Sequence, residues 1–264
     1  MIGWGTIGRT RAATARLGGL ALALVALPLL AQTAEASHAW RDPTTGKPYH
    51  WARDGAVRLA LLDHVTPGWD THLRAANTDW NRSASLENRV VARSDGASIR
   101  RSCPSVDGKA RVCNDAYGAT GWLGLTAIEY VAATGHITSA VVQLNDSYRL
   151  TAGEKRSVVC HELGHVWGLA HRGDAEATCM TAGPVFPRRP DAHDFEQVRA
   201  LYKHGDGTTT ISRTAADAAG RWSVPAVRGP ARGGTSVVVT DLGGGRRLVV
   251  FVDWAEPTTP VRES

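Results

Sequence analysis

The hydrophobic pattern of the chain predicts short strands alternating with amphipathic helices. Residues 137–144 (Ile-Thr-Ser-Ala-Val-Val-Gln-Leu) are rich in β-branched side chains and predict a strand that ends at Asn145. Alternating apolar positions predict a strand over residues 56–62, and residues 89–94 and 97–101 have the composition of short strands. The glycines of residues 118–124 predict a turn region. These elements favour an α+β domain.

Helical spacing stands out at three places. Apolar residues recur on one face of residues 69–86, which predicts a helix there. Thr151 followed by Glu154 forms a capping box, in which each side chain satisfies a backbone amide of the other residue, so a helix should begin at this point. A further helix is expected over residues 195–202, opened by the Asp191-Ala-His-Asp194 segment.

The composition changes after Lys203. Residues 205–210 form a polar linker, and the valine-rich runs 237–240 and 248–252 flank a Gly- and Arg-rich turn, which predicts a β-hairpin. Because a two-stranded hairpin is rarely stable alone, we expect it to dock on the main domain. The chain therefore divides into residues 1–36, a domain over 37–204, and a linker and hairpin extension over 205–264.

Residues 1–36 have the features of a secretory signal peptide. Arg9, Arg11 and Arg16 precede an apolar stretch, and Ala34-Glu35-Ala36 fits a small-x-small cleavage site. The apolar stretch is short and interrupted for a membrane span, although an uncleaved anchor is the alternative reading. We expect a secreted, extracellular protein that has no membrane attachment after cleavage.

Charge gives little indication of a partner. The whole chain has a formal net charge of +5, and removing residues 1–36 takes away three arginines and one acid, which leaves +3. No Lys/Arg run with interleaved aromatics suggests a nucleic-acid surface. We expect a monomer with no nucleic-acid partner.

The chemistry of the chain is concentrated in one motif. His161 and His165 lie four residues apart, so on a helix both imidazoles project from one face and can bind one metal ion. Glu162 can accept a proton from a metal-bound water, and Gly168 allows the turn that would bring His171 in as a third ligand. Three imidazoles leave a fourth position for water, as expected of catalytic zinc. The motif reads His-Glu-Leu-Gly-His-Val-Trp-Gly-Leu-Ala-His.

Four cysteines in an exported chain favour disulfides. Three pairings are possible. Cys103 and Cys113 are near neighbours around a turn-rich segment, and a Cys160–Cys179 bridge would join the zinc helix to the loop after its third ligand. Zinc ligation by Cys160 is disfavoured, because on a helix it points about 100° away from its neighbour His161.

With this motif and Met180 nine residues after His171, the chain resembles the metzincin zinc endopeptidases, and most closely the matrixin-like secreted metalloproteases of actinobacteria. The resemblance implies a small twisted mixed sheet packed on a long active-site helix, a methionine turn at Met180 and a C-terminal helix. It implies one catalytic zinc held by the three histidines, Glu162 as general base, and protein or peptide substrates. The similarity also covers the segments 121–125, 136–138, 143–146, 178–180 and 193–197.

The sequence departs from the family in two respects. Thr181-Ala182-Gly183 follows Met180, so an additional tyrosine ligand is not expected, and no cysteine-switch segment precedes the domain. A calcium ion is compatible with the family, but no spacing singles out its ligands among the polar loop residues Asp107, Asn145, Asp146 and Asp174.

An extended substrate would pair with the edge of the 137–144 strand by β-augmentation. The alternative function is a secreted zinc-containing binding protein that has the protease fold but little turnover, with its function residing in the C-terminal extension.

Overall fold

The structure, a computed structural model, describes residues 38–173, 178–181, 189–214, 221–229 and 234–262. The expected signal peptide and Asp174 lie outside these residues. Residues Ala36–Ser264 form one compact unit with an α+β fold and a single mixed sheet. Its elements are β1 (His50–Trp51), β2 (Ala60–His64), α1 (Pro67–Trp80), β3 (Arg89–Ala92), α2 (Ala97–Ser102), β4 (Ala110–Asp115), β5 (Trp122–Val131), β6 (His136–Asn145), α3 (Ala152–Val166), α4 (Ala192–Leu201), β7 (Thr235–Gly243) and β8 (Arg246–Trp254).

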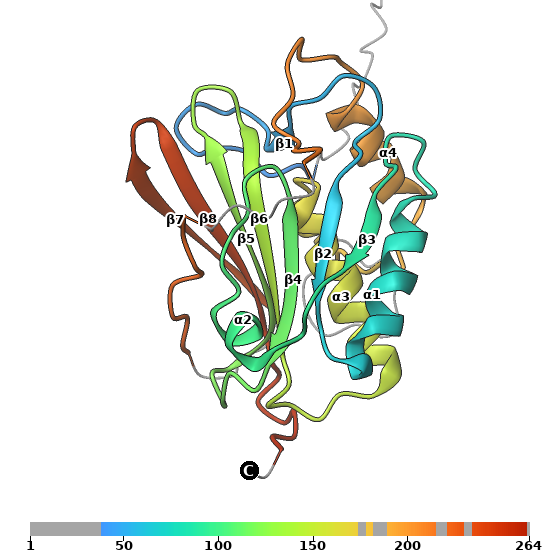
Figure 1. Cartoon of the computed structure of the whole chain (residues 1–264), viewed down its shortest axis with the longest axis vertical. Helices are drawn as coiled ribbons and strands as arrows, with labels where there is room; N and C mark the ends of the chain where they lie inside the picture. The colour runs from blue at the N-terminus through green and yellow to red at the C-terminus, as the bar shows by residue number, and fades with distance from the viewer. Residues whose placement is uncertain (1–37, 174–177, 182–188, 215–220, 230–233, 263–264) are drawn as a thin grey trace, which may run out of the picture. The chain divides into compact units, whose positions relative to one another are not determined.

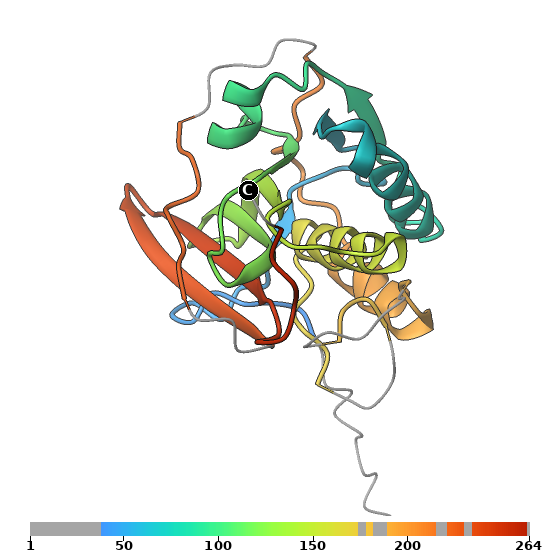
Figure 2. The ribbon, with the colours of Figure 1, turned by 90° about the horizontal axis from the view of Figure 1, so that it is seen from below.

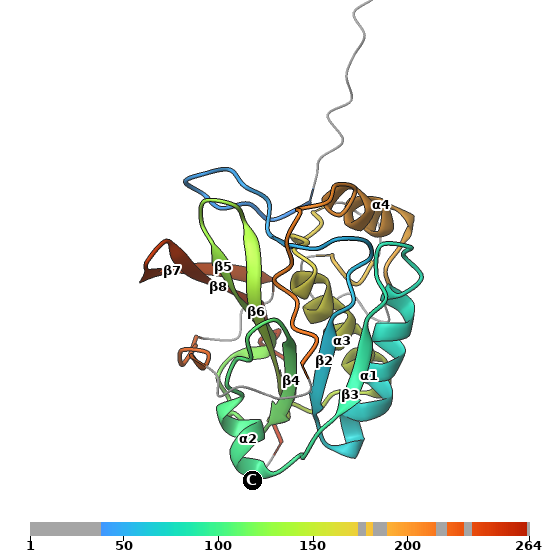
Figure 3. The same ribbon diagram turned by 45° about the horizontal axis from the view of Figure 1, so that its top comes forward.

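The strands lie in the order β3-β2-β4-β6-β5-β8-β7, and β1 pairs with one end of β6. Strands β1, β2, β3, β4 and β6 pair in parallel, whereas β5, β8 and β7 continue the sheet in antiparallel fashion. Helices α1, α3 and α4 cover one face of the sheet, as Figures 1 and 3 show. The main apolar core lies between these layers.

The opposite face of the sheet carries a smaller apolar cluster. The view from below in Figure 2 shows α1, α3 and α4 together on one side of the strands. On the other side, Trp122, Leu125 and Val250 are covered by the partly buried Trp222 and Val224. Strands β5 and β8 are therefore buried on both faces, which fits the continuous apolar run 248–252 of β8.

The hairpin of residues 235–254 docks on the main sheet. Strand β8 pairs with β5 along its whole length, from Trp254 opposite Trp122 to Arg246 opposite Val131. The prediction of a docked hairpin is confirmed, with strands longer than the valine runs indicated. The docked hairpin leaves β7 rather than β5 at the edge of the sheet, and β7 exposes Val238, Val239 and Leu242.

One expectation about substrate binding is wrong. Strand β6 contains the predicted 137–144 strand, but it is not an edge, because β4 pairs with one side of it and β5 with the other. Its backbone amides and carbonyls are therefore already used within the sheet, and no peptide can add to it there.

Two element predictions need correction. Residues 97–101 form the short helix α2 rather than a strand. This helix ends at Cys103, which adopts a left-handed conformation (φ 37°) and donates its amide to Ile99. The helix predicted over 69–86 stops at Trp80, because the side chain of Asn81 hydrogen-bonds both backbone groups of Asn88 and turns the chain back.

Other boundaries moved, and three strands, β1, β4 and β5, were not predicted. The strand expected over 56–62 begins at Ala60, and the last helix begins at Ala192, because Asp191 and Asp194 form its capping box. The turn region 118–124 ends where β5 starts at Trp122. Strands β4 and β5 were missed because buried polar side chains interrupt their apolar pattern, Asn114 in β4 and Glu129 in β5.

Candidate metal centre

Helix α3 begins at the predicted capping box. The Thr151 hydroxyl accepts the Glu154 amide at 3.3 Å, and the Thr151 amide donates to the Glu154 carboxylate at 2.7 Å. Residues 157–166 of the helix are buried all round, because the sheet, α1 and the Met180 loop enclose them. A helix enclosed in this way is normally apolar. Ser157, His161, Glu162 and His165 are the polar exceptions, and such buried polar groups need specific partners.

Three imidazoles converge above this helix. The His161 and His165 Nε2 atoms lie 3.2 Å apart, and the His171 ring centroid is 5.1 Å from that of His161 and 4.6 Å from that of His165. A set of ring nitrogens, one from each residue, lies within 4.8 Å of one another. The histidines picked out by their spacing are thus brought together as a group that could hold a metal ion.

Gly168 is the turn that delivers His171. Its φ of +90° is one that side-chain-bearing residues rarely adopt, and a Cβ there would collide with the carbonyl of Tyr49. The helix ends just before it, with the Gly168 amide donating to His165 O at 3.0 Å. The chain then reverses, and the partly buried His171 faces the two helix histidines.

Backbone carbonyls fix the tautomers of the two helix histidines. His161 Nδ1 lies 2.7 Å from Cys179 O, and His165 Nδ1 lies 2.8 Å from Leu169 O. Since a carbonyl only accepts, each Nδ1 carries the proton and each Nε2 keeps its lone pair for a metal.

Burial keeps the three imidazoles neutral. It lowers the pKa of His161 to about 4, although the hydrogen bond to Cys179 acts in the opposite direction. Burial also lowers the pKa of His165, which the neighbouring His171 and His161 depress further. The pKa of His171 falls for the same two reasons, burial first and His161 second. Neutral imidazole is the form that ligates metal ions.

Glu162 points one unpaired oxygen into the protein interior. Its side chain is fully buried, and Oε2 accepts a 2.6 Å hydrogen bond from the Thr126 hydroxyl. Glu162 Oε1 and His171 Nε2 are both buried without a hydrogen-bond partner among the described residues. Burial raises the pKa of Glu162 well above its usual value, and the nearby Asp253 carboxylate adds to this. An unpaired His171 Nε2 among converging imidazoles fits a bound cation.

Met180 lies directly against the helix between the two ligand positions. Its side chain is fully buried, and it packs so closely on Gly164 that a Cβ on that residue would overlap the Met180 sulfur. The Met180 amide donates to the Thr178 hydroxyl at 2.9 Å, and that hydroxyl donates to Asp194 on α4 at 2.6 Å. Met180 thus serves as an apolar support for the helix.

The structure contains both expected disulfides. Cys160–Cys179 joins α3 to the Met180 loop, so the residue before His161 is covalently linked to the residue whose carbonyl orients the His161 ring. Cys103–Cys113 links α2 to β4. Both of its cysteines are fully buried in a separate cluster with Val141, so this second bridge does not lie in a surface loop.

Three residues that adjoin the centre had no signal in the sequence. Thr126 comes from β5, which was not predicted, and Phe251 from β8 stacks on His165 with ring centroids 4.6 Å apart. The Trp40 ring meets the His171 ring edge-on and lies at a tilt to the Phe251 ring. Only packing of distant segments could reveal them, since none stands at a fixed spacing from the motif.

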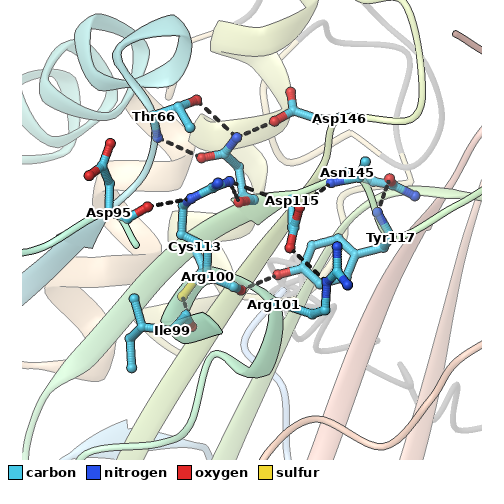
Figure 4. Close-up of polar contacts among 12 residues, drawn as sticks. Thr66, Asp95, Ile99, Arg100, Arg101, Cys113, Asp115, Tyr117, Asn145 and Asp146 are labelled. Atoms are coloured by element: carbon cyan, nitrogen blue, oxygen red, sulfur yellow. Dashed lines mark hydrogen bonds and ion pairs between the residues drawn. The ribbon is translucent and has the colours of Figure 1, made fainter. Parts of the chain in front are cut away.

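The polar residues considered for calcium are used in protein contacts. Asp146 accepts the Trp69 indole N–H at 2.7 Å and also pairs with Asn114, while Asn145 donates to two carbonyls and to Thr120. Figure 4 shows both residues within a network of hydrogen bonds that includes Asp115 and Arg101. Asp107 pairs with Arg221. No calcium site follows from these residues.

No protein-family model matches this chain, and no curated protein shows significant similarity to it. Among the described residues, none of the helices is both long and apolar enough to cross a bilayer.

Proposed function

We propose that this protein is a secreted zinc-dependent endopeptidase of the metzincin type. The observation that carries the proposal is the buried convergence of three neutral imidazoles, together with the buried Glu162 next to His161 in the sequence, whose Oε1 has no hydrogen-bond partner among the described residues. The set suits zinc, because it offers three nitrogen donors and leaves a fourth position open. A zinc ion bound there would supply a polarised water and a Lewis acid for a substrate carbonyl.

Glu162 has the position and the environment of a general base. Its Oε2 is held by the Thr126 hydroxyl, so the free Oε1 is the atom that would accept a proton from the attacking water. Burial raises its pKa well above the usual value of a glutamate, which favours holding a proton that could later be delivered to the leaving amine. Thr126 therefore acts as a positioning residue for Glu162.

The test is a comparison of Glu162→Gln with the wild-type protein. Zinc content and fold should be retained, because the imidazoles are untouched, whereas kcat/KM for peptide hydrolysis should fall at least about 100-fold, the scale of a lost general base. Glu87→Gln is a matched control, since Glu87 is exposed and pairs only with Arg58 on the surface. Near-normal hydrolysis by the Glu162→Gln variant would refute the mechanism.

The alternative function, a zinc-containing binding protein with little turnover, is favoured by one observation. Glu162 and His165 are at most 1 % exposed, and β8 occupies the edge of β5 that an extended peptide would otherwise use. Digestion of a peptide library by the zinc-loaded wild-type protein separates the two functions. Cleavage that disappears in the Glu162→Gln variant supports the endopeptidase, and intact peptides retained on the protein support the binding function.

A further inference from the structure

A second group of imidazoles surrounds a single carboxylate oxygen. The Oδ1 atom of Asp206 lies 3.4 Å from Nε2 of His50, 3.4 Å from Nε2 of His136 and 3.2 Å from Nε2 of His204. The Nε2 atoms of His50 and His204 are themselves 3.3 Å apart. This group shares no residue with the centre on α3.

The four residues come from three distant segments of the chain. His50 and His136 are direct partners where β1 pairs in parallel with the start of β6. His204 and Asp206 follow the end of α4 at Leu201. The Asp206 segment is fixed beside β1 by two backbone-directed hydrogen bonds, in which the Asp206 amide donates to Arg53 O and the Arg53 amide donates to Asp206 Oδ2.

Four of the six separations among the four ligand atoms match a tetrahedral metal site, and the ligand atoms of His50, His136 and Asp206 all lie within 4.8 Å of one another. Zinc binds imidazole nitrogens and carboxylate oxygens at about 2.0–2.1 Å, so ligand atoms at the corners of a tetrahedron stand about 3.3 Å apart. The four separations measured here run from 3.2 to 3.4 Å. They are longer than good hydrogen bonds between such groups, which are usually near 2.8 Å.

His50 and Asp206 each use one polar atom for a backbone hydrogen bond, which leaves their other polar atoms, His50 Nε2 and Asp206 Oδ1, available for a metal ion. His50 Nδ1 lies 2.9 Å from the carbonyl of Pro48, so this nitrogen carries a proton, and in the neutral tautomer the Nε2 lone pair points toward Asp206. Asp206 uses Oδ2 for the Arg53 amide, which leaves Oδ1 facing the imidazoles. Lone pairs that face one another in this way repel, and a cation between them removes the repulsion.

We propose that these residues form a second zinc site with a structural role, its ligands being His50, His136, His204 and Asp206. Four protein ligands complete a tetrahedron and leave no position for a reacting water, which distinguishes this site from the centre on α3. The side chains of His50 and Asp206 are buried, whereas that of His204 is 47 % exposed, so a metal ion can enter from the His204 side.

The proposed site would join three parts of the fold. Zinc would link β1, the start of β6, and the segment that leaves α4 toward the C-terminal hairpin. Each link spans many residues of sequence, so the cross-link should stabilise the folded state. The expected role is to hold the exit of α4 against the sheet.

Zinc counting on the full-chain protein tests the proposal. We expect two zinc equivalents in the wild type and one in His204→Gln, whose side chain is exposed enough for the substitution to leave the fold intact. His72→Gln is the matched control, because His72 lies on α1 outside both groups, and it should retain two equivalents. Two equivalents retained in both His204→Gln and His136→Gln would refute the second site.

A parallel variant separates this proposal from the proposed function. His171→Ala should remove only the zinc of the α3 centre, and adding zinc to the metal-stripped variant should still raise its Tm. The double variant that also carries His204→Gln should show no such rise. If wild-type protein holds one zinc that is lost in His171→Ala but not in His204→Gln, the second site is wrong and the catalytic centre stands. If the single zinc is instead lost in His204→Gln but retained in His171→Ala, the second site is supported and the catalytic centre is wrong.

Discussion

The phenyl ring of Phe251 lies nearly parallel to the imidazole of His165, with the ring planes inclined by 20° and the centroids 4.6 Å apart. Phe251 belongs to β8, more than eighty positions along the chain from the motif, and it is fully buried. The C-terminal hairpin therefore forms part of the wall of the candidate metal centre, in addition to extending the sheet.

This contact predicts that the hairpin controls access to the centre. Phe251→Leu keeps an apolar side chain but removes the ring, so zinc should be lost to a chelator several-fold faster, with a stability loss of about 1.5 kcal/mol or less. Val250→Ala, on the opposite face of β8, should lower stability by about 1–3 kcal/mol with no change in zinc release. Equal release rates in both variants would show that the hairpin does not shield the metal.

His171→Ala should abolish peptidase activity and weaken zinc binding by at least about tenfold, since two imidazoles four residues apart remain. Competition with a chromogenic chelator measures the affinity. His193 lies with His38 and Asp194 rather than with the α3 centre, so His193→Ala is a matched control that should leave the affinity unchanged. As many tightly held zinc equivalents in the His171→Ala variant as in the wild type would require a different ligand set at this centre.

The two disulfides should have separable effects. Replacing Cys160 and Cys179 by serine opens a loop of 19 residues, worth about 3 kcal/mol in the chain-entropy model, and releases the carbonyl that orients His161. Lower Tm and greater sensitivity to EDTA are expected together. The matched Cys103/Cys113 double variant should lower Tm by a similar amount but leave EDTA sensitivity unchanged, because that bridge lies in a different cluster. Greater EDTA sensitivity in both variants would contradict this assignment.

Asp63 should contribute a loss of stability as pH rises from about 4 to 6, opposite in sign to the contribution of the buried histidines of the α3 centre. Burial, reinforced by the nearby Asp70 carboxylate, raises the pKa of Asp63 from 3.8 to about 6. In that interval the folded state holds a proton that the unfolded state has released, so unfolding becomes easier with increasing pH. The contribution is on the order of 1–2 kcal/mol, and Asp63→Asn should remove it from urea denaturation curves taken across this range. Asp54→Asn, at an exposed position, should leave the slope as in the wild type.

The local arrangement of the α3 centre could be predicted from sequence. Thr151 and Glu154 specify where the helix begins, and the spacing of His161 and His165 then places both rings on one face, because the helical repeat fixes the relation between residues four apart. Gly168 marks the helix end for an equally local reason, since few other residues accept its backbone angles. The 137–144 strand and the C-terminal hairpin were found because their β-branched runs are short-range signals.

Only the tertiary structure decided which segments meet around these elements. The pairing of β8 with β5 places Phe251 against His165 and removes the sheet edge expected for substrate, yet no spacing in the chain links these residues. The same holds for Thr126 beside Glu162, and for the cluster around Asp206, whose members are drawn from three segments. Helix periodicity and turn chemistry act over a few residues, whereas strand order and side-chain packing depend on how the whole chain buries its apolar surface.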